Sequence, residues 1–272
     1  MDSIITFLVL LVLGYLLKGT GVLSKRDADT IRKLVFNVCL PCMAFQAMRS
    51  STLDSTFILI AVVVVVLHVL GYLIFRFSNK SLGEVVFAGW AGNTAFMGYP
   101  IVESVLGPEG LSRAVVFDQA NTIMIILVWL QKGIKSILSP PLLGAIFGIL
   151  LKRVQIPVPF MDAVSMLAKA TSPLAMIYTG CILTLEWDHR VLPALLVKFF
   201  LLPATACALS KLMGLPLIDH QVVVLQSSMP TMVVSTIYGE QLGLDTAFLS
   251  KTVVLSTLLY PLSFVLWSNL LM

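Results

Sequence analysis

Apolar segments long enough to cross a lipid bilayer follow one another along the 272-residue chain, separated by short charged turns. A helix of about 20 residues spans a hydrocarbon core of roughly 30 Å. Charged residues make up 12% of the chain and hydrophobic residues 58%, with a mean hydropathy of +0.97, whereas a soluble domain is about one-quarter charged. The pattern predicts an all-α integral membrane protein. No basic cluster is interleaved with aromatic residues, so nucleic acid is not an expected partner.

Taken in order, the apolar segments predict ten transmembrane helices. The first segment is as short as a signal-peptide core, but no basic residues precede it and no small-residue cleavage pattern follows, so it is counted as a span. The ten spans are Ser3–Leu17, Ala28–Met48, Thr56–Phe75, Glu84–Ser104, Gly107–Leu130, Pro140–Leu151, Met161–Leu183, Val191–Leu209, Val222–Tyr238 and Thr246–Leu270.

The distribution of basic residues predicts the orientation of these spans. The loops after spans 1, 3, 5 and 7, together with the adjoining ends of the spans, carry ten Lys and Arg residues, and the opposite loops with their adjoining span ends carry five. Because cytoplasmic loops are enriched in Lys and Arg, the first set is expected in the cytoplasm. Both termini are therefore predicted to lie outside the cell membrane.

The stretch Gly92–Pro100 interrupts the fourth span with polar and helix-breaking residues. Pro100 has no backbone N–H, so the carbonyl about one turn earlier, near Phe96, is expected to lose its partner. In lipid, such groups must be satisfied by protein or by a wet cavity. The stretch predicts either a broken helix that forms a binding site at mid-membrane or a kinked helix packed through its glycines.

Short matches between the two halves of the chain predict an internal repeat. With five spans in each half, the second half must enter the membrane inverted, giving repeats at residues 1–136 and 137–272. Spans 4 and 9 then occupy corresponding positions, and such a pair of broken helices points to the central site of a transporter. The matches are Gly14–Lys18 with Gly148–Lys152, Leu40–Ala44 with Ser172–Met176, and Leu106-Gly107 with Leu242-Gly243, at offsets of 134, 132 and 136.

The residues Asn93–Pro100 resemble the fourth-span motif of the auxin efflux carrier family, which includes bacterial organic-acid permeases. Three other spans carry similar motifs, so the resemblance covers essentially the whole chain. These motifs are Leu34–Asn37 with Leu40-Pro41, Asp118–Asn121, and Met229–Thr231 with Tyr238-Gly239.

The resemblance implies the ten-helix, 5+5 inverted-repeat fold of bile-acid sodium symporters, in which broken helices 4 and 9 cross beside the substrate. It also implies a scaffold of helices 1, 2, 6 and 7, through which a homodimer is expected. Helices 3–5 and 8–10 would move against this scaffold as an elevator. The loop between spans 5 and 6 is only Gln131–Ser139, so auxin itself is a weaker expectation than another small acid.

Polar side chains within the spans supply the candidate site. Asp118 lies deep in a span, and intramembrane carboxylates commonly relay protons; a structural hydrogen bond is the alternative. Asn121 shares its helix face. His68 and Lys198 are further coupling candidates, with an interhelical hydrogen bond and a snorkelling amine as their alternatives. The predicted substrate contacts are Asn93, Thr94, Gly98, Pro100, Ser228, Met229, Pro230 and Thr231.

These features favour a secondary transporter of a small organic anion, such as a mono- or dicarboxylate, working by alternating access. Half-helix N-termini would attract the anion. Proton coupling is the first expectation, with a sodium-coupled symporter, a channel or a sensor as alternatives. No cofactor, metal cluster, nucleophile elbow or phosphate loop is found, so an enzyme is not expected.

Three further residues have expected environments. Glu84 and Glu103 fall at span ends and are expected to face water or lipid headgroups. Val64 belongs to the Val-rich third span and is expected to face lipid.

Overall fold

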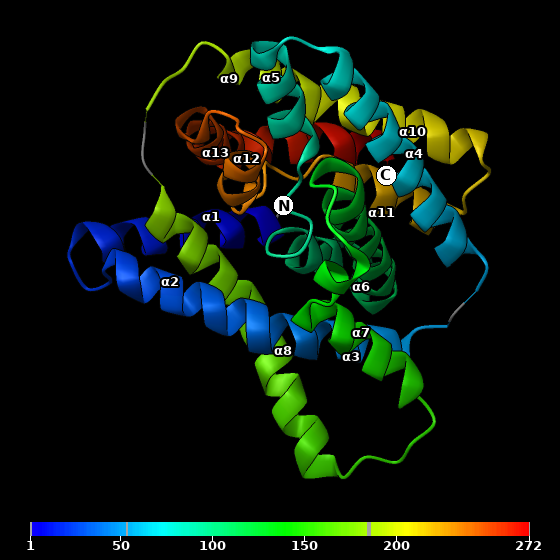
Figure 1. Ribbon diagram of the computed structural model, residues 1–272. Helices are drawn as coiled ribbons and strands as arrows, with labels where there is room; N and C mark the ends of the chain where they lie inside the picture. Colours follow the sequence, from blue (N-terminus) through cyan, green and yellow to red (C-terminus); the bar gives the residue numbers. More distant parts are fainter. Residues whose placement is uncertain (1, 53, 184–185, 272) are drawn as a thin grey trace. The chain divides into compact units, whose positions relative to one another are not determined.

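A computed structural model describes residues 2–52, 54–183 and 186–271, and its regular elements are helices (Figure 1). Helices satisfy their own backbone polar groups, as the hydrocarbon interior of a membrane requires. The α-helices are α1 (Asp2–Gly19), α2 (Lys25–Leu34), α3 (Leu40–Ser50), α4 (Thr56–Phe77), α5 (Lys80–Trp90), α6 (Gly98–Met124), α7 (Pro140–Leu150), α8 (Val158–Ile182), α9 (Val191–Leu196), α10 (Leu202–Leu212), α11 (Leu217–Ser227), α12 (Ser235–Gln241) and α13 (Thr246–Leu271).

Several helical segments are apolar enough for a membrane. Among the residues that the structure describes, four are long and apolar enough to cross a bilayer, by length and composition, and two shorter ones are apolar. The multi-pass, all-α class is confirmed, whereas the ten spans and the inverted repeat stay predictions. The four are Thr56–Phe77, Gly98–Trp129, Val191–Leu212 and Thr246–Leu271, and the shorter two are Ile5–Gly19 and Pro140–Leu150.

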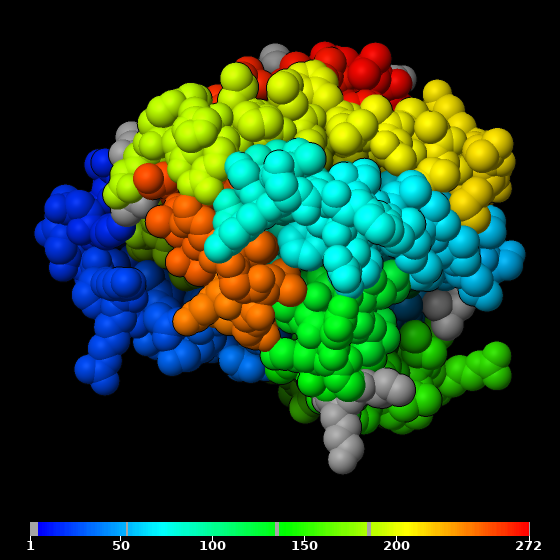
Figure 2. Space-filling model, turned by 45° about the horizontal axis from the view of Figure 1, so that its top comes forward, coloured from blue at the N-terminus to red at the C-terminus, as the bar shows by residue number. Residues whose placement is uncertain are grey.

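The exposed face of α4 identifies side chains suited to contact lipid. Ile58, Val62, Val65 and Val69 are 40–67% exposed and follow one another every three or four residues, so they form one stripe along the helix. Figure 2 shows α4, in light blue to cyan, beside α10, in yellow. Val64 is fully buried, so the expectation that it faces lipid was wrong. A continuous run of valines carries no pattern that separates lipid-facing from protein-facing positions.

The chain divides into two compact units, which are described separately. Unit 1 contains α1, α2, α3, α7 and α8, and unit 2 contains α4, α5 and α9 to α13. The proposed repeat boundary at residue 136 stays a prediction. Unit 1 comprises Met1–Leu53, Ala95–Val115 and Leu138–Leu183, and unit 2 comprises Asp54–Thr94, Val116–Ile137 and Thr184–Met272.

Within unit 1, α1 and α8 approach each other at two glycines. A β-carbon placed on Gly14 would lie 2.1 Å from the carbonyl oxygen of Ile177. One placed on Gly180 would lie 2.1 Å from the carbonyl oxygen of Leu11. Larger side chains would push the helices apart, which is why small residues mark close helix contacts in membranes.

Two π-helical turns end two residues before a proline. Proline lacks an N–H, and its ring crowds the carbonyl four residues earlier. The π turns Val35–Cys39 and Val197–Leu201 come just before Pro41 and Pro203, and they change the hydrogen-bond register where an α-helix would clash. The second of these turns contains Lys198.

A sharp bend divides α6 at Gly107. Its φ of 67° and ψ of −167° are accessible to glycine without a steric penalty. Pro108 follows in the first turn of the next helical part, where proline is tolerated. The predicted start of the fifth span coincides with this bend.

Candidate functional site

The first helix break lies between α5, which ends at Trp90, and α6, which begins at Gly98. The intervening residues 91–97 are not helical. Pro100 lies in the first turn of α6, where proline is tolerated. The expected loss at Phe96 is present, because Tyr99 and Ile101 donate to the carbonyls of Ala95 and Met97, whereas Pro100 between them has no N–H to donate to the carbonyl of Phe96.

The second break, between α11 and α12, pairs with the first through the main chain. The N–H of Asn93 donates to the carbonyl of Pro230 at 2.7 Å, and the N–H of Met232 donates to that of Ala91 at 2.8 Å. Each break thus satisfies backbone groups that the other has freed. The residues bridged between these bonds, in antiparallel orientation, are Gly92 and Thr231.

Side chains complete the hydrogen bonding at the crossing. The Thr231 hydroxyl donates to the carbonyl of Ala88 at 2.8 Å, and Gln226 Nε2 donates to the carbonyl of Thr94 at 3.2 Å. The hydroxyl of Ser228, the residue that follows α11, donates to the carbonyl of Leu225 in the last turn of that helix. Several oxygens that were expected to meet a substrate or a sodium ion are therefore engaged within the protein.

A chain of buried hydrogen bonds connects Asp118 with Trp129. The Thr94 hydroxyl donates to Asp118 Oδ1 at 2.6 Å, and Asn121 Nδ2 donates to that hydroxyl oxygen at 3.3 Å. Asn121 Oδ1 lies 2.8 Å from His68 Nε2, and Trp129 Nε1 lies 3.1 Å from His68 Nδ1. The five side chains are only 2–5% exposed. The structure therefore joins three of the predicted coupling residues through Thr94.

The hydrogen bonds that connect Trp129 with Asp118 all donate in the same direction. The indole N–H of Trp129 can only donate, so the imidazole Nδ1 accepts and the hydrogen of the neutral ring is assigned to Nε2. Nε2 then donates to Asn121, whose amide donates to Thr94, whose hydroxyl donates to Asp118. Gln119 Nε2 donates to the other carboxylate oxygen at 2.9 Å. Each link therefore directs its hydrogen toward the carboxylate.

Lys198 lies beside a small cavity at the crossing. The side chain is fully buried, and Nζ has no hydrogen-bond partner in the part of the chain that the structure describes. The cavity measures about 10 Å³, at the lower limit for one water molecule, so a carboxylate does not fit. Its lining includes Lys198, His68, Gly92, Thr94, Asn121 and Gln226.

Asn93 carries a second buried donor. The residue is 4% exposed, and its Nδ2 has no hydrogen-bond partner among residues 2–52, 54–183 and 186–271. Its backbone N–H is separately engaged with Pro230. The side-chain amide is thus available for a ligand without disturbing the crossing.

The predicted substrate contacts are divided between the units. Gly98 and Pro100 belong to the first turn of α6 in unit 1. The other six belong to unit 2, where Ser228, Met229 and Thr231 are fully buried.

Unit 1 contains a larger cavity of about 550 Å³. Arg49, Lys152 and Lys169 line it with three positive charges, and Glu103 adds one negative charge. Arg49 and Lys152 also donate to carbonyls that follow α7 and α3, respectively. The positive excess suits a small anion.

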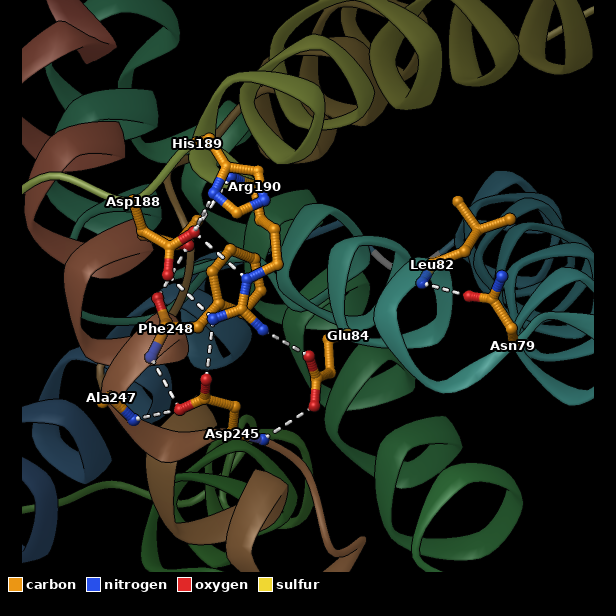
Figure 3. Close-up of polar contacts among 10 residues, drawn as sticks. Asn79, Leu82, Glu84, Asp188, His189, Arg190, Asp245, Ala247 and Phe248 are labelled. Carbon is orange, nitrogen blue, oxygen red and sulfur yellow. Dashed lines mark hydrogen bonds and ion pairs between the residues drawn. The ribbon is translucent and has the colours of Figure 1, made fainter.

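Figure 3 shows an ion-pair cluster in unit 2 that fastens the beginnings of α5, α9 and α13. Arg190 lies 2.7 Å from Glu84 Oε2, 2.8 Å from Asp188 Oδ2 and 2.7 Å from Asp245 Oδ2. Its hydrogen bonds lower the pKa of Asp188 to about 2 and also lower the pKa of Asp245. Glu84 is 3% exposed, so its expected place in water or headgroups was wrong; Glu103 is exposed.

Comparison with known proteins identifies the family. The model of a family described as membrane transport protein matches residues 1–133 and 124–268. The chain belongs to this family. This membership confirms the resemblance to auxin efflux carriers, and the protein is a membrane transporter.

Two curated relatives of this membrane transport protein match along nearly their whole length. An uncharacterized transporter of Methanothermobacter thermautotrophicus is 29% identical over 296 residues, covering 99% of this chain and 98% of the relative. An uncharacterized transporter of Methanocaldococcus jannaschii is 27% identical over 307 residues, covering 100% of this chain and 99% of the relative.

Sequence reasoning missed three side chains in the site of this membrane transport protein. Gln119 had a local signal, because it directly follows Asp118 in the quoted motif. Trp129 and Gln226 lie 61 and 132 residues from their hydrogen-bond partners, and no local pattern connects positions so far apart.

Titratable side chains in the described ranges give no sign of a metal centre. Across residues 2–52, 54–183 and 186–271, no group of three or more His, Cys, Asp or Glu side chains is arranged to hold a metal ion. The buried side chains joined to Asp118 interact through hydrogen bonds.

Proposed function

We propose that this membrane transport protein is a secondary transporter that carries a small organic anion across the cell membrane by alternating access, with the proton as coupling ion. The observation that carries the proposal is the buried hydrogen-bonded chain that ends on Asp118 beside the helix crossing. A carboxylate inside a membrane is costly and characteristically functional. A group that gains and loses a proton as the site opens to each side can couple the two movements.

Two features support an anionic substrate, such as a mono- or dicarboxylate. The cavity of unit 1 has three basic side chains and one acidic side chain in its lining. The Nδ2 group of Asn93 is a buried donor with no acceptor in the described ranges, and a carboxylate supplies acceptors only. In this proposal Asn93 binds the substrate, and Thr94 positions Asp118.

The remaining assignments follow from this mechanism. Ser228, Met229, Pro230 and Thr231 shape the crossing, and Gly98 and Pro100 form the first turn of α6 after the first break. Both termini lie outside the cell membrane, because the basic loops favour the cytoplasm. The scaffold helices form a homodimer, and the other helices move against them as an elevator.

Uptake by proteoliposomes tests the function. Purified protein is reconstituted and given a panel of labelled mono- and dicarboxylates under an imposed proton or sodium gradient. Saturable accumulation driven by the proton gradient is expected. Accumulation driven by sodium alone would select the sodium-coupled alternative, non-saturable flux would indicate a channel, and indifference to every anion would contradict the substrate class.

Asn93→Ala tests the substrate contact. The substitution removes the side-chain amide but keeps the backbone N–H that pairs with Pro230, so folding should survive while carboxylate affinity falls. Val65→Ala, on the exposed face of α4, is the matched control. Normal substrate binding by Asn93→Ala, together with lower thermal stability, would assign the amide to helix packing instead.

A further inference from the structure

The amine of Lys198 is buried away from water, and the described residues give it no acidic partner. The side chain is fully buried, and its Nζ has no hydrogen-bond partner in the portion of the chain that the structure describes. A lysine near a membrane surface would extend its amine to water, but no part of this side chain is exposed. A buried ammonium group requires compensation from charges or dipoles nearby.

The surroundings of Nζ supply that compensation. A β-carbon built on Gly92 would lie 2.9 Å from Nζ, so the amine lies directly against the bridge between the two breaks. Two half-helices end beside this bridge, α5 at Trp90 and α11 at Ser227. The C-terminal end of a helix carries partial negative charge. The crossing is therefore a position at which two helix ends favour one cation.

The same geometry argues against a direct contact between Lys198 and an anionic substrate. The adjoining cavity of about 10 Å³ admits no group larger than a water molecule. The other polar side chains in its lining include His68, Thr94, Asn121, Gln226 and Ser227, none of which is acidic. A single small cation matches both the volume and the dipoles.

We propose that the ammonium group of Lys198 is a tethered cation that permanently fills a cation site at the helix crossing. The inference rests on the proposed function and deepens it, because it implies that the helix crossing does not bind a sodium ion from solution. With the ammonium in place, a sodium ion would meet a like charge in a medium of low dielectric constant. The π turn before Pro203 contains Lys198, and such turns frequently mark functional positions.

Two substitutions separate charge from volume. Lys198→Ala removes the ammonium and leaves space beside the cavity, whereas Lys198→Met fills most of the space without a charge. Lys211→Ala is the control, because Lys211 is an exposed lysine of the same helical segment. Thermal unfolding of the purified full chain is followed at constant ionic strength in chloride salts of N-methylglucamine, sodium, potassium and methylammonium.

The wild type and Lys211→Ala should unfold at the same temperature in all four salts. Lys198→Ala should be less stable in N-methylglucamine and should gain several degrees, saturably, with sodium or methylammonium, since a ligand that binds the folded state raises its stability. Lys198→Met should be destabilised and should not respond. If Lys198 were neutral and destabilising, Lys198→Met should instead be as stable as the wild type or more stable.

Three results would overturn the inference: a wild type stabilised specifically by sodium, a Lys198→Ala variant that no cation affects, or wild-type stability in Lys198→Met. If Lys198→Ala does not fold in any salt, the methionine variant decides alone. These measurements need no substrate, so they stand apart from the uptake assay. Proton-driven uptake by the wild type together with a cation-indifferent Lys198→Ala would reject the tethered cation and leave the proposed function intact.

Discussion

Replacing Thr94 by valine removes the hydroxyl that connects Asp118 with the rest of the buried chain while keeping the branched shape of the side chain. The hydroxyl donates to Asp118 Oδ1 at 2.6 Å and accepts from Asn121 Nδ2 at 3.3 Å. Loss of a hydrogen bond to a charged group costs about 1.5–3 kcal/mol. The stranded amide donor of Asn121 adds about 1 kcal/mol, near the low end of the range because its bond is long.

The sum is about 3 kcal/mol of unfolding free energy. For a protein of this size, each kcal/mol lowers the unfolding temperature by about 2–4 °C, so Thr94→Val should unfold about 6–12 °C below the wild type. Thr94→Ser keeps the hydroxyl and loses one methyl group, which costs about 1 kcal/mol. The serine variant should therefore lie between the wild type and the valine variant.

The assay is thermal unfolding in one detergent, with proton-driven uptake measured on the same preparations. Thr94→Val should lose uptake more strongly than Thr94→Ser. Equal unfolding temperatures for the valine and serine variants would refute the reasoning, because the hydroxyl would then contribute nothing to the chain. Unchanged uptake by Thr94→Val would show that proton coupling does not need the buried hydrogen-bonded chain.

Three further predictions concern coupling, acid stability and topology. Asp118→Asn should abolish accumulation driven by a pH gradient but keep substrate exchange at equal pH; wild-type pH dependence in this variant would move coupling to another residue. Arg190 holds the pKa of Asp188 at about 2, below its ordinary 3.8, so this contact should stabilise the fold fully above pH 3.8 and lose its effect as the pH falls through 2. Thermal unfolding between pH 5 and pH 2 should show a smaller acid-induced loss in Asp188→Asn than in the wild type, and equal losses would contradict the assignment. Single cysteines at positions 2 and 272 of a cysteine-free variant should both react with an impermeant maleimide on intact cells, and labelling of one end alone would contradict the predicted topology.

The sequence by itself determined the class, the family and the positions of both helix breaks. Apolar segments of membrane-spanning length follow one another along the whole chain, and such segments are stable in the hydrocarbon interior of a membrane. The breaks are local chemistry, because Gly, Pro and adjacent polar residues weaken a helix wherever they occur in it. Asp118 could be selected because a carboxylate inside an apolar segment stands out without any knowledge of its partners.

Only the tertiary structure decided how these residues are satisfied. The main-chain groups of Ala91 and Asn93 pair with residues about 140 positions further along the chain, and no periodic pattern records such a pairing. Val64 and Lys198 are both fully buried. From the sequence, Val64 was expected to face lipid, and Lys198 could have extended its amine to the membrane surface. The physical reason is common to these cases: lipid and protein interior are equally apolar, so composition cannot tell which of them surrounds a side chain until the helices are packed.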